Sequence, residues 1–190
     1  MEARPKAAAG RGVTRRRDSL RAGITDAEVS AVLRIQAMTA TPLAWRGALL
    51  LSHAGEHALC WIGFGLAGAA LDAGRRRSWL RAAGAVAGAH ALSVVLKRLA
   101  RRPRPSDPRI LVRLDAPSPW GFPSSHAAST AAAGVAYSRL LGHRFPLVPV
   151  PLMMASRVIV GLHYPSDVLA GAVLGGVVGR LAGARTPARR

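Results

Sequence analysis

The chain has 190 residues, half of them hydrophobic, and carries 27 lysines and arginines against 9 aspartates and glutamates, a formal net charge of +18. A nucleic-acid-binding domain with this charge would gather its basic and aromatic side chains on one face. Here the basic residues stand in short blocks between apolar runs, as at residues 15–17 and 75–77, which is typical of membrane spans with flanking charge. The composition therefore argues against a nucleic-acid partner and indicates an integral membrane protein.

The N-terminal part of the chain is predicted to contain a tail and one helix. Residues 1–23 are rich in Arg, Ala and Gly and are predicted to be a disordered basic tail. Residues 24–42 are predicted to form an amphipathic helix, which Thr25 and Glu28 open as a T-x-x-E capping box. Apolar residues recur on one face at helical spacing, namely Val29, Val32, Leu33, Ala37 and Ala40. Because the rest of the helix is polar, including Gln36, we expect it to lie at the membrane interface.

Residues 43–184 are predicted to form an all-α transmembrane bundle. About five apolar segments approach the roughly 20 residues that cross a bilayer. They cover approximately residues 47–73, 79–96, 124–141, 145–162 and 166–184. These segments are rich in Ala and Gly, which let helices approach closely in lipid. Residues 185–190 then form a basic C-terminal tail, and no feature of the sequence specifies an oligomeric state.

The basic blocks also predict an orientation in the cell membrane. Residues 75–77, the turn at residues 142–144 and the C-terminus fall on one face, which the positive-inside rule places in the cytoplasm. The polar, proline-rich loop at residues 97–123 then lies on the extracytoplasmic face, together with His163. With five spans the basic N-terminal tail would also lie outside, against the same rule, unless residues 27–51 cross as well.

Three polar motifs interrupt the apolar pattern at predicted span ends on the extracytoplasmic face. In chain order they are K-x6-R-P at residues 97–105, P-S-S-H at residues 123–126 and S-R-x5-H-x3-D at residues 156–167. Ionisable side chains are costly beside lipid. Their appearance at three span ends on one face therefore predicts a functional site there.

The residue types in these motifs suit a phosphate ester. A phosphomonoester carries about two negative charges at neutral pH. Lys97, Arg104 and Arg157 supply fixed cations, and an arginine can hold two phosphate oxygens at once. A helix start at Ser124 and Ser125 would offer backbone N–H groups to the same anion. The sequence thus predicts a phosphate-binding site.

Two histidines in the motifs can carry phosphoryl transfer. Histidine can act as a nucleophile and form a covalent phospho-intermediate without a metal. His163 suits this role because Asp167 can hold its other ring nitrogen and set the tautomer. Since Pro165 interrupts regular helix between them, a turn and a helix start must set their geometry. His126 is then available to protonate the departing alkoxide as general acid.

Taken together, the three motifs resemble those of the type 2 phosphatidic acid phosphatase (PAP2) superfamily, over roughly residues 47–184. The resemblance implies a metal-independent phosphoric monoester hydrolase that needs no cofactor and acts on a lipid phosphate in the membrane. It also implies that His163 is the nucleophile, His126 the acid and Asp167 the orienting carboxylate. Ser125 stands where the second motif usually has glycine, but a serine keeps the backbone N–H.

The substrate is indicated by resemblance alone. The short chain, the stretch SHAGEHALCW at residues 52–61 and the P-S-S-H form are similar to the actinobacterial branch, whose assigned activity is dephosphorylation of decaprenylphosphoryl-5-phosphoribose. Undecaprenyl diphosphate, phosphatidylglycerol phosphate and phosphatidic acid are alternatives, because the phosphate-binding residues select neither tail nor head group. We expect Glu56 and His57 to contact the head group or to stabilise the phosphate-binding arginines.

Other interpretations of these residues remain. Residues 53–57 match the H-x-x-E-H pattern of zinc metalloproteases and are predicted to lie on one helix. Such a protease needs a further ligand, commonly a downstream glutamate, and no glutamate follows Glu56, which leaves only His90. Arg157 and Asp167 could instead form a structural ion pair. A non-catalytic membrane protein that keeps the site for lipid binding is the third alternative.

Overall fold

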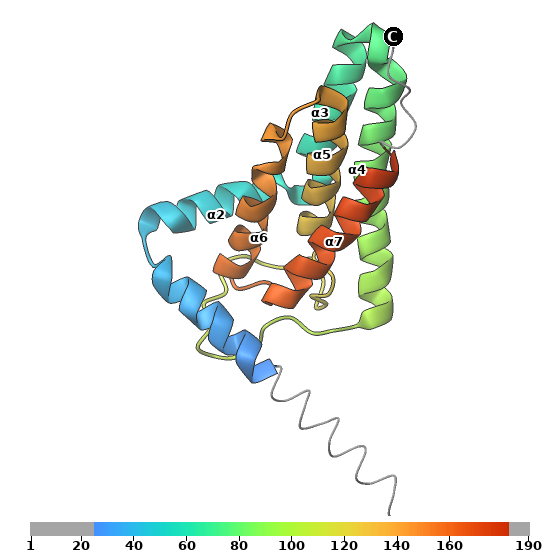
Figure 1. Cartoon of the computed structure of the whole chain (residues 1–190). Coiled ribbons are helices and arrows are strands. Elements are labelled where there is room, and N and C mark those ends of the chain that lie inside the picture. The colour runs from blue at the N-terminus through green and yellow to red at the C-terminus, as the bar shows by residue number, and fades with distance from the viewer. Residues whose placement is uncertain (1–24, 183–190) are drawn as a thin grey trace, which may run out of the picture.

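The computed structural model describes residues 25–182 and shows an all-helical arrangement (Figure 1). A helix at residues 25–38 is followed by α2 (Pro42–Ala54), α3 (Leu59–Leu71), α4 (Arg76–Ala100), α5 (Ser125–Leu141), α6 (Pro149–Ile159) and α7 (Pro165–Ala182). Short 3-10 turns lie at Glu56–Ala58, Ala73–Arg75 and Phe145–Leu147. The all-α prediction is confirmed for this part of the chain, whereas the predicted tails at residues 1–23 and 185–190 lie outside the described residues.

Helix α5 forms the centre of the bundle and packs against α4, α6 and α7. Its many alanines and its one glycine have small side chains, so the neighbouring helices can pack closely around it. Almost the whole stretch from residue 127 to residue 137 is therefore buried. Two hydrogen bonds attach α3 to it. Tyr137 donates from its hydroxyl to the carbonyl of Trp61 at 2.7 Å, and the Trp61 indole donates to the Thr130 hydroxyl at 3.0 Å. Both polar side chains are therefore satisfied within the bundle.

The contact between α5 and α7 depends on glycines spaced one turn apart on α7. A Cβ placed on Gly175 would lie only 1.9 Å from the carbonyl oxygen of Ala128 in α5. Gly171 and Gly179 meet the α5 backbone in the same way, at 2.4 and 2.6 Å. The predicted close approach of small-residue helices is thus present, and it brings the starts of α5 and α7 together.

The prediction of one span over residues 47–73 is wrong, because the chain forms two helices there. Helix α2 ends at Ala54, and α3 begins only at Leu59. Between them Gly55 lies so close to α6 that a Cβ would meet Met153 at 2.6 Å, and Ala58 adopts a left-handed φ of +61°. Helix α2 therefore runs sideways across the end of the bundle, while α3 runs along it (Figure 1).

The lengths of the other helices refine the predicted spans. Residues 73–100 and 165–182 are long and apolar enough to cross a membrane by themselves. Leu59–Leu71 and Phe145–Ile159 are shorter apolar helices. The predicted fourth span, residues 145–162, ends early because α6 stops at Ile159. A total of about five spans therefore stays a prediction.

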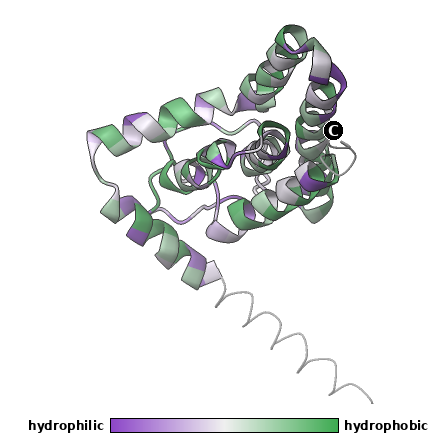
Figure 2. Ribbon diagram, turned by 45° about the horizontal axis from the view of Figure 1, so that its top comes forward, coloured by the Kyte–Doolittle hydropathy of each residue, from purple (hydrophilic) through white to green (hydrophobic). Residues whose placement is uncertain are grey.

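Hydrophobic residues recur along the helices of the bundle, as Figure 2 shows. Many of them are exposed on the helices around α5, including Leu66, Leu80, Leu92, Leu152, Val173 and Leu181. Water-soluble monomers rarely expose apolar patches of this extent. This surface is suited to lipid tails.

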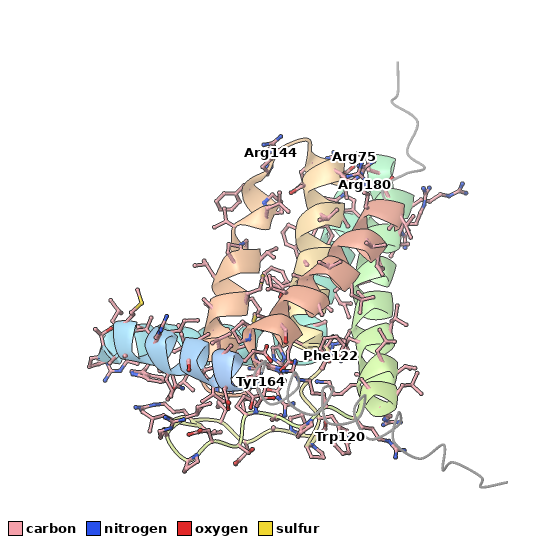
Figure 3. The ribbon with its side chains drawn as sticks, turned by 60° about the horizontal axis from the view of Figure 1, so that its bottom comes forward. Arg75, Trp120, Phe122, Arg144, Tyr164 and Arg180 are labelled. Carbon is pink, nitrogen blue, oxygen red and sulfur yellow. The ribbon has the colours of Figure 1, made fainter. Side chains whose placement is uncertain are left out.

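The two ends of the bundle differ in chemistry. Arg75, Arg144 and Arg180 lie at one end, and Trp120, Phe122 and Tyr164 lie at the other (Figure 3). The basic turns therefore share one end, as predicted. The long segment at residues 101–124 covers the opposite end, where the three motifs lie.

The helix at residues 25–38 packs across the motif end instead of standing apart from the bundle. Val29 and Val32 are buried in a cluster with Ile110 and Val168. The segment at residues 101–124 is thus held between this helix and α7. The helix is part of the support of the motif end.

Gln36 was predicted to lie off the apolar face of that helix, and this prediction is wrong. Its side chain is buried, and its Nε2 donates to the carbonyls of Leu111 and Ile159, both at 2.9 Å. Its Oε1 accepts from the Leu111 N–H at 3.1 Å, so the buried amide is satisfied. Ala37, which was placed on the apolar face, is exposed. The buried face is therefore rotated toward Gln36.

Replacing Gly175 by alanine is expected to destabilise the protein by about 1–3 kcal/mol, because the new methyl group would overlap the α5 backbone. Gly176→Ala is the matched control, since a Cβ there meets nothing within 4 Å and alanine favours helix. Thermal unfolding in detergent should show a lower Tm for G175A and an unchanged or higher Tm for G176A. Equal Tm values would contradict the tight α5–α7 contact.

Candidate active site

A cavity of about 560 Å³ at the motif end of the bundle brings the three motifs together. Each motif contributes defining residues to the lining, which are Lys97 and Arg104, Ser125 and His126, and Arg157 and His163. The end of α2 and its turn add Ser52, His53 and Glu56, and the 101–124 segment adds Asp115 and Trp120. The predicted convergence of distant parts of the chain is therefore present in the structure.

Helix ends place the charged groups around this cavity. Lys97 and Arg157 lie in the last turns of α4 and α6, and both are buried. Ser125 and His126 lie in the first turn of α5. Ser124, predicted to bind phosphate, caps α5 instead, because its hydroxyl accepts from the Ala127 N–H. Its side chain is buried and does not line the cavity, so its contribution is to fix the helix start.

Arg104 is locked in place beside His163. Its Nε donates to the carbonyl of Ser118 at 2.8 Å, and its Nη1 donates to the carbonyl of Leu162 at 2.9 Å. The same Nη1 lies 3.1 Å from the Nε2 of His163. A guanidinium can only donate, so Nε2 is the accepting nitrogen of a neutral ring and Nδ1 carries the hydrogen. The lone pair that a nucleophile needs is therefore on the nitrogen beside the cation.

The other ring nitrogen of His163 faces Asp167. Nδ1 lies 3.5 Å from Oδ2, and both side chains are almost fully buried. This distance is too long for a good hydrogen bond from the Nδ1–H group to the carboxylate, and such contacts often tighten only when substrate binds. Helix α7 begins at Pro165, and the Tyr164 N–H donates to Oδ2 at 2.9 Å. The predicted turn and helix start are both present between the two residues.

The surroundings of His163 favour its neutral form. Burial lowers the pKa of His163 well below its ordinary value, and the charges of Arg157, Arg104 and Lys97 lower it further. The ring lies in the loop between α6 and α7, at the edge of the cavity. A neutral imidazole is the form that can attack phosphorus.

His126 is held by a different contact. Its Nε2 lies 3.1 Å from the carbonyl oxygen of Ser52 at the end of α2. A carbonyl only accepts, so Nε2 carries the hydrogen and Nδ1 is left to exchange a proton. The bond also connects the start of α5 to α2.

Arg157 is a buried cation whose Nε has no hydrogen-bond partner among the residues that the structure describes. A buried donor left unpaired is costly unless a ligand pairs with it. Because its side chain lines the same cavity as Lys97, the arrangement fits an anion such as a phosphate. The interpretation of Arg157 and Asp167 as an ion pair is wrong, since the ion-pair partner of Asp167 is Arg102.

Arg102 lies within the first motif but was not predicted to be a site residue. Its Nη1 donates to Asp167 Oδ1 at 2.9 Å and to the Ser166 hydroxyl at 2.5 Å, and its Nη2 pairs with Glu28. The chain has arginines at 101, 102 and 104, and nothing in that run distinguishes the middle one. Asp115 was missed too, because a loop carboxylate has no periodic signal.

The structure lacks the single helix on which the zinc-protease interpretation depends. His53 lies in α2, whereas Glu56 opens a 3-10 turn after Gly55, so the H-x-x-E-H pattern is not on one helix as predicted. Among the residues that the structure describes, no group of three or more His, Cys, Asp or Glu side chains could hold a metal ion. His53 and Glu56 both line the cavity. The side chain of His57, the other predicted head-group contact, is outside the described part of the chain.

An apolar helical bundle with a cationic cavity and two histidines at one end is typical of the helical membrane phosphatases. Residues 78–189 match the model of the PAP2 superfamily. The chain belongs to this family, as the three motifs predicted.

Relatives and a solved structure agree with this assignment. A protein of Mycobacterium tuberculosis is 48% identical over 131 residues, which cover 69% of this chain and 74% of the relative. One of Mycolicibacterium smegmatis is 44% identical over 135 residues, covering 71% and 75%. Both are named decaprenylphosphoryl-5-phosphoribose phosphatase. The crystal structure of a transmembrane PAP2-type phosphatidylglycerolphosphate phosphatase from Bacillus subtilis matches with a TM-score of 0.66 and 25% identity, over 82% of this chain and 84% of that one.

His163 is expected to be neutral, with its hydrogen on Nδ1, at pH 6.5, because its pKa is lowered from the ordinary value of about 6.5. Nitrogen NMR of protein labelled with 15N-histidine can show this, with His163→Gln used to assign the signal. A protonation midpoint near the ordinary value, or a hydrogen on Nε2, would contradict the tautomer deduced from Arg104.

Proposed function

We propose that this membrane phosphatase removes phosphate from a lipid-linked substrate in two steps, through a phosphohistidine on His163. The observation that supports the proposal most directly is the position of His163 Nε2, which lies 3.1 Å from Arg104 in a cavity shared with Lys97 and Arg157. The cations would hold the phosphate oxygens where Nε2 can reach the phosphorus.

In the first step the lone pair of His163 Nε2 forms a bond to phosphorus. The phosphorus–oxygen bond to the leaving group breaks, and its electron pair stays on that oxygen. His126 gives its proton to this oxygen, so an alcohol departs. The phosphorylated ring keeps its hydrogen on Nδ1 and becomes cationic, and Asp167 stabilises this charge. Lys97, Arg104 and Arg157 neutralise the three phosphoryl oxygens.

In the second step water replaces the histidine. His126, now neutral, accepts a proton from the attacking water while its oxygen bonds to phosphorus. The phosphorus–nitrogen bond breaks, and its electron pair returns to Nε2. Inorganic phosphate leaves, and both histidines are in their starting states. The scheme uses only groups of the three motifs and needs no metal ion.

We propose that the bundle is multi-pass in the cell membrane, with this site on the extracytoplasmic face. Arginines at the opposite end support the orientation through the positive-inside rule (Figure 3). The helix at residues 25–38 would lie at the interface together with α2. Met38, Leu43 and Leu50 on these helices are exposed and would enter the lipid.

We propose decaprenylphosphoryl-5-phosphoribose as the substrate, as in the relatives at 44–48% identity. This name describes a phosphate on a pentose, so the leaving group would be a sugar hydroxyl near further hydroxyls. The cavity wall beyond the cations carries Glu56 and Asp115, whose carboxylates can accept hydrogen bonds from such hydroxyls. Glu56 remains the proposed head-group contact, with His57 beside it in the chain. Phosphatidylglycerol phosphate is the second candidate, because of the solved structure that the fold resembles.

The mechanism predicts different effects for the two histidines. With 32P-labelled substrate and an alkaline quench, His163→Ala should form no phosphoenzyme. The rate of phosphoenzyme formation in His126→Asn should fall about 10²–10⁴-fold with an alkyl phosphate, the usual contribution of a general acid. This rate should fall much less with p-nitrophenyl phosphate, whose leaving group needs no proton. A phosphoenzyme in His163→Ala, or equal losses of His126→Asn on both substrates, would contradict these roles.

The substrate proposal predicts a preference for a phosphopentose head group. Purified protein in EDTA should hydrolyse polyprenyl-phosphoryl-phosphoribose with a higher kcat/KM than phosphatidylglycerol phosphate, undecaprenyl diphosphate or phosphatidic acid. Glu56→Gln should raise KM for the phosphopentose by about 10-fold, from the loss of a charged hydrogen bond, and leave phosphatidic acid unaffected. His57→Ala can be tested in the same way. A uniform effect on all substrates would contradict a head-group role.

A further inference from the structure

Arg102 lies behind the catalytic groups and contacts two carboxylates at once. Its Nη1 donates to Asp167 Oδ1 at 2.9 Å, and its Nη2 pairs with Glu28 on the helix at residues 25–38. Arg102 does not line the cavity, and it contacts Oδ1 of Asp167, whereas His163 faces Oδ2. Its guanidinium also lies 4.9 Å from the centre of the Tyr164 ring. Arg102 is thus held by four separate partners, with the Ser166 hydroxyl as the fourth.

Asp167 needs support of this kind, because its carboxylate is fully buried. A buried charge is stable only if it is paired and hydrogen-bonded. The Tyr164 N–H fixes Oδ2 at 2.9 Å, on the side of His163, and Arg102 fixes Oδ1. With only the first contact the carboxylate could rotate about its side-chain bonds, and its 3.5 Å contact with His163 Nδ1 would lengthen.

Glu28 connects this arrangement to the N-terminal helix. One of its oxygens pairs with Arg102, and the other accepts the Ser166 N–H at 3.2 Å, one residue before Asp167. The carboxylate thus holds both Arg102 and the first turn of α7. Val29, which follows Glu28 directly, and Val32, one turn later, are buried against the bundle. The backbone that carries Glu28 is therefore held in place.

We propose that Arg102 and Glu28 are positioning residues for Asp167, and that through them the N-terminal helix sets the geometry of the nucleophile His163. The inference rests on the proposed phosphohistidine mechanism. Neither residue touches substrate. Arg102 fixes the orientation of the Asp167 carboxylate, and Glu28 fixes the orientation of the Arg102 guanidinium. Arginine suits this position because its planar group can serve two carboxylates in one plane, which a lysine cannot.

The test measures phosphoenzyme formation in a rapid alkaline quench with 32P-labelled p-nitrophenyl phosphate, using the full chain in detergent. Arg102→Met should slow the rate of formation by about 10- to 100-fold, as expected when a group that orients a reactive side chain is lost. The rate is expressed per folded protein, measured by size-exclusion chromatography of the same sample, because slower formation against unchanged hydrolysis also lowers the phosphoenzyme amplitude. A merely structural defect would reduce the folded fraction and leave this rate unchanged. Arg102→Lys should restore part of the rate, because it keeps one charge contact.

The matched control is Arg109→Met. Arg109 lies in the same 101–124 segment and pairs with Asp107 at 2.8 Å, but this pair is exposed and touches no catalytic group. It should react at the wild-type rate. Glu28→Gln should slow the reaction less than Arg102→Met and add little to it in the double variant, since both act through Asp167. Asp26→Asn, on the exposed side of the same helix, is its control.

Equal phosphorylation rates for Arg102→Met and Arg109→Met would overturn the proposal. If Arg102→Met yields no folded protein, the decision passes to Arg102→Lys and Glu28→Gln, and wild-type rates in both would overturn the proposal. Additive losses in the double variant would refute the shared action through Asp167. If the wild-type protein forms no phosphoenzyme while still releasing phosphate, the proposed mechanism itself fails, which is a separate outcome.

Discussion

One buried carboxylate connects the three motifs at the motif end of this protein. Asp167 contacts all three motifs. Its Oδ2 faces His163 in its own motif, its Oδ1 accepts from Arg102 within the first motif, and its backbone carbonyl accepts from the Ser124 N–H in the second at 3.0 Å. A carboxylate in an apolar bundle is stable only with such partners. The three motifs therefore depend on one another for their positions, although they are far apart in the chain.

Helix ends distribute charge around that carboxylate in a consistent way. The C-terminal end of a helix carries partial negative charge and favours a cation, and Lys97 and Arg157 stand in the last turns of α4 and α6. The N-terminal end favours an anion, and α5 starts at Ser125 beside the same cavity. Backbone dipoles thus offset part of the repulsion among the cations. The bundle geometry itself creates an anion site, and the side chains complete it.

The family, the helical class and the motif residues that line the cavity could be predicted from the sequence, because motif spacing and span ends are local properties. Features that depend on a contact between distant parts of the chain could not be predicted. Gly55 and Ala58 break an apolar run that hydropathy treats as one helix, since the break comes from packing against α6. Gln36 is buried because two backbone carbonyls far along the chain accept from it. Arg102 differs from its neighbours only by its three-dimensional position beside Asp167.

Two supports hold the start of α7, and they differ in kind. On one side the glycine face of α7 meets the α5 backbone, so that Asp167 is fixed relative to the start of α5, where His126 lies. On the other side Glu28 and Arg102 hold Ser166 and Asp167 through charge and hydrogen bonds. The first contact is van der Waals packing along a whole helix, so its loss would act on folding. The second involves a few polar atoms at one helix end, so its loss would act on the orientation of one carboxylate and would also leave a buried charge without its partner. Packing and the orientation of Asp167 therefore depend on different elements of the chain.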